Sequence, residues 1–212
     1  MRQLLKTTAT FLAVYFVLLL LLHLFEGKKQ FAQLYQKQTS TLFSSFGNGG
    51  KVSVKHFKDL QGKFDTRYTL SSKYQIENAK AGALKKGLKT VDIQIVSFPI
   101  NTWNFAGIFF LFYFALIMAS PISLKQKILP LVLGFLIIIG FVLFKQWFSL
   151  FLKFSEFYDR FHVGTTNQTL IGLFRHFFNV ILFPFFGLMI SGLLWFFFCF
   201  ERVKKQIISN KI

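Results

Sequence analysis

Long apolar runs alternate with polar segments along this chain. An apolar run of about 17 or more residues is long enough to cross the hydrocarbon core of a bilayer as a helix. The pattern therefore predicts a membrane protein with four transmembrane α-helices, at residues 1–25, 103–122, 128–144 and 168–200.

The first and last apolar segments carry additional signals. Residues 1–25 begin with basic side chains, but the apolar part is too long for a cleaved signal peptide and no small-residue cleavage site follows it. We therefore expect an uncleaved signal-anchor helix. The segment 168–200 is longer than one crossing needs and contains Pro184, which predicts a kink or a tilt.

Residues 26–102 are polar and basic, and they form a predicted external domain between the first two spans. "GNGG" at 47–50 is a strong breaker, and the alternation of "KVSVKHF" (51–57) and "TVDIQIVSF" (90–98) predicts strands. The expected fold is a small α+β or mainly β domain. Because a domain of this size is marginally stable alone, we expect it to rest on the membrane, the helices or a partner.

Residues 145–163 have the spacing of an amphipathic α-helix outside the membrane. Its polar stripe has intervals of three or four residues and is interpreted as a solvated helix face: Lys145, Ser149, Lys153, Glu156 and Arg160. The opposite face is aromatic and is predicted to contact lipid or a partner: Trp147, Phe148, Phe151, Phe154, Phe157, Tyr158 and Phe161. Two arrangements are open. The helix lies flat on the membrane after a bend, or it extends helix 128–144 and is covered by another subunit.

The net charge is +17, with 25 basic and 8 acidic residues. Basic residues cluster at three places beside the predicted spans: Arg2, Lys6, Lys125, Lys127, Arg202, Lys204 and Lys205. The positive-inside rule places all three clusters in the cytoplasm. Both termini, including a basic tail at 201–212, are therefore expected in the cytoplasm, with the chain as a multi-pass protein of the bacterial inner membrane.

The basic domain has several predicted partners besides the lipid bilayer itself. Since the topology places residues 26–102 outside the cytoplasm, we exclude nucleic acid as a partner. Anionic lipid, anionic polysaccharide or an acidic protein would match the lysines, and a merely solvated lysine-rich face is an equal alternative.

An enzymatic interpretation would use the polar residues near the predicted outer leaflet: Glu156, Asp159, His162, Arg175 and His176. Carboxylates with histidine and arginine could perform acid–base chemistry on a lipid or peptide. Their spacing matches no catalytic or metal-binding motif, and Cys199 is the single cysteine. No cofactor and no metal are expected.

The predicted function is that of a non-catalytic accessory or structural subunit of a membrane protein complex. The layout is similar to that of accessory membrane proteins of bacterial envelope, secretion and sorting machinery, where other membrane subunits would be the partners. An outer-leaflet enzyme is the alternative. A transporter component ranks lower, because spans one to three contain no ionisable group in their cores.

Overall fold

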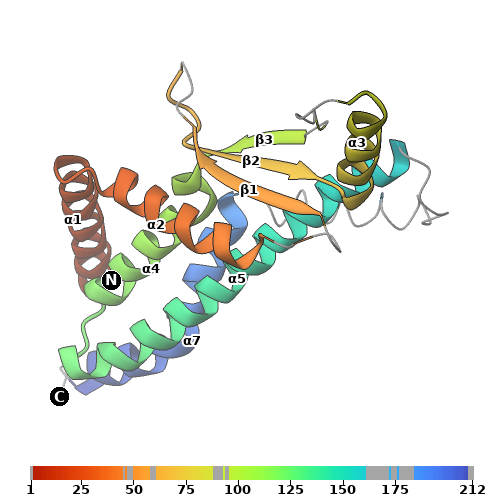
Figure 1. The fold of residues 1–212 in the computed structure, drawn as a ribbon. Helices are drawn as coiled ribbons and strands as arrows, with labels where there is room; N and C mark the ends of the chain where they lie inside the picture. Colours follow the sequence, from red (N-terminus) through yellow and green to blue (C-terminus); the bar gives the residue numbers. More distant parts are fainter. Residues whose placement is uncertain are drawn as a thin grey trace. The chain divides into compact units, whose positions relative to one another are not determined.

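The computed structural model describes residues 2–44, 46, 50–57, 61–87, 93, 96–160, 172, 176 and 184–209, with backbone only at 2–4, 154–160, 184, 202 and 204–209. The chain is mostly helical and contains one three-stranded sheet (Figure 1). It divides into two compact units. The helical unit comprises Met1–Lys29, Trp103–Lys145 and His176–Ile212, and the sheet unit comprises Gln30–Thr102 and Gln146–Arg175.

The described residues of the helical unit form four apolar helices. They are α1 (Arg2–Leu24), α4 (Ile108–Ala119), the first part of α5 (Leu124–Arg160) and α7 (Pro184–Ser209). A π-helical turn, η1 (Trp103–Gly107), leads directly into α4. α4 is the central element of this unit, because it contacts both α1 and α7.

Two of these helices are long and apolar enough to cross a membrane, through Leu5–Leu24 and Leu124–Lys153. The apolar parts around α4 and in α7, Trp103–Ala119 and Phe185–Glu201, are shorter than 18 residues. At 1.5 Å per residue each covers about 25 Å, whereas the hydrocarbon core is about 30 Å thick. The described residues thus contain two candidate spans rather than the four predicted from sequence.

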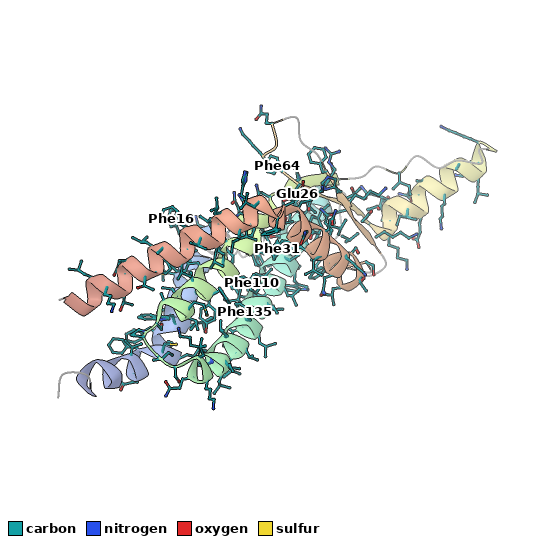
Figure 2. All side chains as sticks on the ribbon, turned by 90° about the vertical axis from the view of Figure 1, so that its left-hand side faces the viewer. Phe16, Glu26, Phe31, Phe64, Phe110 and Phe135 are labelled. Carbon is teal, nitrogen blue, oxygen red and sulfur yellow. The ribbon has the colours of Figure 1, made fainter. Side chains whose placement is uncertain are left out.

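Aromatic side chains fill the interior of the helical unit. Figure 2 shows Phe110 of α4 beside Phe135 of α5, and their ring centroids are 5.7 Å apart in an edge-to-face arrangement. Glycines allow two other close approaches. The Tyr113 ring occupies the space that a Cβ atom at Gly134 would need, and the Phe109 ring does the same at Gly187. Small residues at such contacts let apolar helices pack closely.

The sheet unit contains three antiparallel strands in the order β1-β2-β3: β1 (Lys51–His56), β2 (Thr66–Ser71) and β3 (Val96–Ile100). Its helices are α2 (Gly27–Leu42), which enters it at Gln30, and α3 (Lys73–Lys85). A capping box formed by Ser72 and Gln75 starts α3. Since helices and strands both contribute, the α+β alternative describes this unit.

The period-two pattern at 51–57 correctly predicted β1. β3 (Val96–Ile100) includes the end of the second alternating stretch, and residues 90–92, 94 and 95 of that stretch lie outside the described residues. α5 continues from Leu124 to Arg160 as one helix, so no break separates predicted segments 128–144 and 145–163 up to residue 160. No proline or glycine stands near Lys145 to produce one. α7 likewise continues through residues 201–209, which were expected to form a tail.

Candidate functional site: a buried polar cluster and a buried lysine

The interior of the sheet unit contains a group of hydrogen-bonded polar side chains, which we call the buried polar cluster. Its hydrogen-bonded members come from α2, the segment before β2, the start of β2, the segment after β3 and α5: Tyr35, Gln36, Thr39, Asp65, Thr66, Thr102 and Gln146. The buried phenol of Tyr68 in β2 completes the cluster, and its hydroxyl has no hydrogen-bond partner among the described residues. None of them was singled out by the sequence patterns.

Asp65 is the anionic member of the cluster. Its carboxylate accepts hydrogen bonds from the Thr102 amide at 3.1 Å, the Thr102 hydroxyl at 2.8 Å and the Thr66 hydroxyl at 2.9 Å. The antiparallel pairing of Thr66 with Ile100 brings the start of β2 beside the end of β3, which explains the proximity of these residues. The Asp65 carboxylate therefore joins the two strand ends.

Helix α2 is joined to the same cluster through two adjacent side chains. Gln36 Nε2 donates to the Thr66 hydroxyl at 2.7 Å and to the Asp65 carbonyl at 3.2 Å. The Tyr35 hydroxyl donates to Oε1 of Gln146 in α5 at 2.8 Å. Buried polar groups need such partners because an unsatisfied one is costly. The cluster thus connects both helices to the sheet.

Burial and electrostatics keep the two phenols of the cluster neutral. Burial raises the pKa of Tyr68 to about 12, and the Asp65 charge adds to this effect. Burial, reinforced by neighbouring Tyr68 and by Asp65, also raises the pKa of Tyr35 well above its ordinary value. A phenol with a raised pKa is a poor base or nucleophile near neutral pH. The cluster is thus better suited to holding elements together than to proton transfer.

Lys145 is a second unusual group, in the helical unit. Its side chain is 1% exposed, and its Nζ donates to the Phe105 carbonyl in the π-helical turn η1 at 3.2 Å. The ammonium also lies 4.1 Å from the ring centroid of Phe105 and 5.1 Å from that of Phe109. A cation over aromatic faces is attracted by the ring quadrupole, and π-helical turns are frequent at functional sites.

The expected solvated stripe is therefore wrong at its first residue. Helical spacing placed Lys145 on a polar face, but η1 and α4 cover this side of α5 and supply its partners. Lys153 is half-buried, and the side chains of Glu156 and Arg160 lie outside the described residues. No local signal could have found Lys145, because its partners precede it by about 40 residues.

The side chains on the aromatic face of α5 differ in their exposure. Trp147 and Phe151 are 44% and 43% exposed, and their rings stack with centroids 5.7 Å apart. Phe148 is only 5% exposed, so the chain itself covers this ring. The side chains of Phe154, Phe157 and Tyr158, and the whole of Phe161, lie outside the described residues.

The residues of the enzymatic interpretation are not brought together by the part of the chain that the structure describes. The side chains of Glu156 and Asp159, and all of His162 and Arg175, lie outside it, while His176 is exposed. Within the described ranges, no three His, Cys, Asp or Glu side chains gather as a metal site would require. Cys199 is buried. The enzyme alternative remains a prediction.

The basic residues expected to set the topology differ in their surroundings. Lys125 is exposed. Lys127 is buried and donates to the Met118 carbonyl at 2.6 Å. Lys6 is exposed. The structure does not describe the side chains of the other four residues, which are Arg2, Arg202, Lys204 and Lys205.

Comparisons with known proteins assign no relative to the chain. No family model, no curated protein and no solved structure matches it.

Proposed function

We propose that this chain is a non-catalytic accessory subunit of a membrane protein complex, and that the exposed part of the α5 aromatic face contacts another subunit. The observation that carries this proposal is the stacked pair Trp147–Phe151, whose rings are more than two-fifths exposed near the C-terminal end of the candidate span Leu124–Lys153. Exposed aromatic side chains that are already ordered are typical anchors of protein interfaces.

The surface of α1 supports the same proposal. No residue in the apolar window of its candidate span is buried within the chain, and large side chains such as Phe16 and Leu20 are exposed. Figure 2 shows Phe16 pointing away from the helix on its outer side. Because α1 buries so little of its surface within the chain, its apolar side chains are available to lipid or to a partner helix.

The buried polar cluster is the further support. Its hydrogen bonds run from α2 to the strand ends of the sheet and to α5. Such a network rigidifies the unit that presents Trp147 and Phe151. A rigid unit loses less conformational entropy on association than a loose one.

The proposed topology has four transmembrane helices, at residues 1–25, 103–122, 128–144 and 168–200, with both termini in the cytoplasm of a bacterial inner membrane. Its support is the agreement of the three basic clusters. The short apolar helices would be accommodated by local thinning of the bilayer or by interfacial flanking residues. Cysteines introduced at Lys125 and Lys55 in a Cys199→Ala chain test it. A membrane-impermeant thiol reagent should label only the Lys55 site in intact cells.

Site-specific photocrosslinking tests the interface. A photoreactive phenylalanine analogue at position 147 or 151 should form one defined crosslink to another membrane protein in cells. The matched control is the same analogue at Leu84 in α3, which is also highly exposed but lies off the aromatic face. The control should give no such product.

A second measurement links the crosslink to assembly. The double variant Trp147→Ala/Phe151→Ala should lose the partner when it is purified in mild detergent, while remaining folded. A monodisperse monomer whose probes at 147 and 151 react only with lipid would overturn the proposal.

A further inference from the structure

The side of the sheet that faces away from the buried polar cluster is basic and hydroxyl-rich. Strand alternation places Tyr68, Leu70 and Val52 on the buried side. The other side, which we call the outer sheet face, is exposed or half-buried throughout and consists of Lys51, Ser53, Lys55, Arg67, Thr69, Ser71, Ser97 and Pro99.

The strand register arranges these residues in rows across the sheet. Thr69 pairs with Ser53 on one side and with Ser97 on the other, which makes a row of three hydroxyls. Arg67 pairs directly with Lys55. The hydroxyl row thus lies next to a pair of cations, and hydroxyl and cationic donors together suit the oxygens of a phosphate.

The charge on this face is entirely positive. The three strands contain no acidic residue, and Lys55 and Arg67 are like charges in directly opposed positions. Like charges so placed destabilise a sheet, so the face retains an unfavourable pair that a bound anion would relieve. The Arg67 guanidinium lies 3.6 Å from the centroid of the Phe57 ring, which orients this cation in advance.

We propose that the outer sheet face binds the phosphate head groups of anionic phospholipids in the membrane that holds the chain. Where the structure describes the chain on both sides of a boundary, three direct connections join the sheet unit to the helical unit, at residues 29–30, 102–103 and 145–146. Two of them follow or precede apolar helices within a few residues, so the unit is confined near head groups at a high effective concentration.

The chemistry of the face favours lipid over polysaccharide. None of its eight residues is aromatic, and the adjoining Phe57 ring already contacts the Arg67 guanidinium, which lies 3.6 Å from its centroid. Compact basic and hydroxyl donors instead suit separate phosphate groups. The inference requires membrane attachment of the chain, but it does not require a partner subunit. Its failure would thus leave the accessory-subunit proposal intact.

Fluorescence in nanodiscs tests the inference with the full chain. A Ser97→Cys/Cys199→Ala chain carries an environment-sensitive dye at the edge of the outer sheet face and is placed in discs of phosphatidylcholine with rising fractions of phosphatidylglycerol. We expect the dye emission to shift to shorter wavelength as the anionic fraction rises. Each basic residue near an anionic surface contributes about fivefold, so Lys51→Gln/Lys55→Gln/Arg67→Gln should weaken docking about a hundredfold.

The matched control removes the same charge from α3 and its C-terminal cap with Lys80→Gln/Lys85→Gln/Lys86→Gln, three exposed lysines of the same unit. It should stay within about twofold of the parent chain, because its lysines lie off the outer sheet face. Equal losses in both variants would overturn the proposal, since net charge alone would explain them. So would an equal dye response to inorganic phosphate in neutral discs, or a response to a sulfated polysaccharide alone. Hydrogen exchange of the β2 amides confirms that each variant is folded.

Discussion

The hydroxyl of Tyr35 in α2 donates a buried hydrogen bond to Oε1 of Gln146 in α5, over a distance of 2.8 Å and a sequence separation of 111 residues. This bond joins the first helix of the sheet unit to the segment that returns to this unit after residues Trp103–Lys145 of the helical unit. It therefore connects the two chain segments of the sheet unit at their starts.

We expect Tyr35→Phe to destabilise the sheet unit by about 1–3 kcal/mol, because it removes a donor from a buried amide oxygen. Gln146 Nε2 already has no hydrogen-bond partner among the described residues. Replacing the second partner as well, in Tyr35→Phe/Gln146→Leu, should cost less than the sum of the single changes. The free energy of opening, measured by hydrogen exchange of β2 in the full chain, checks this. Strictly additive effects would contradict it.

The neutral phenol of Tyr68 predicts a loss of stability at high pH. Burial raises the pKa of Tyr68 to about 12 in the folded chain, whereas an exposed tyrosine ionises near pH 10. Because the folded-state pKa is the higher one, the contribution is complete below about pH 10 and is lost as the pH rises through about 12. The loss should be about 3 kcal/mol, since each pKa unit corresponds to about 1.4 kcal/mol.

Tyrosinate absorbance and urea unfolding of the full chain, measured across this alkaline range, test the Tyr68 prediction. Tyr68→Phe should remove one late-ionising phenol and flatten the pH dependence of stability. Tyr74→Phe is the matched control, since Tyr74 is exposed on α3. If both variants showed the same pH dependence as the parent, burial of the Tyr68 phenol would not be the cause.

Two glycines of α5 should respond oppositely to alanine. A methyl group at Gly134 would collide with the Tyr113 ring, whose hydroxyl donates to the Pro130 carbonyl at 2.7 Å. Gly134→Ala should therefore cost about 1–3 kcal/mol through overpacking. At Gly140 nothing lies within 4 Å of the added methyl group, so Gly140→Ala should be neutral or stabilise the helix by up to about 1 kcal/mol. Thermal unfolding in detergent compares them, and equal midpoints would be the contrary result.

Lys145 should be required for the π-helical turn. Lys145→Met keeps the length of the side chain but removes the donor to the Phe105 carbonyl and the charge over two rings. We expect destabilisation by about 1–3 kcal/mol and a changed emission of Trp103, which is the first residue of this turn. Lys125→Met, at an exposed lysine of the same helix, should change stability by less than about 0.5 kcal/mol. A Lys145→Met chain as stable as its parent would show that this lysine does not stabilise the π-helical turn.

Local patterns were sufficient for several elements. The apolar runs at 1–25 and 128–144 correctly indicated helices, and alternation predicted β1, because both signals depend on residues within a few positions of one another. The helical spacing from Lys145 onward also agreed with the continuous helix α5. The short apolar segments were less informative, since composition does not determine whether a helix of about 17 residues crosses a bilayer.

By itself, the sequence determined that this is a mostly helical, strongly basic chain with apolar helices and a small strand-containing segment, because chain-local hydrophobic periodicity encodes those features. Only the tertiary structure decided that Lys145 is buried and that Phe148 is covered while Trp147 is exposed. It likewise decided that Asp65 meets Thr102 and that Tyr35 meets Gln146. The physical reason is that burial and hydrogen bonding depend on elements that are distant along the chain, and periodicity within one helix cannot show which of its sides another element will cover.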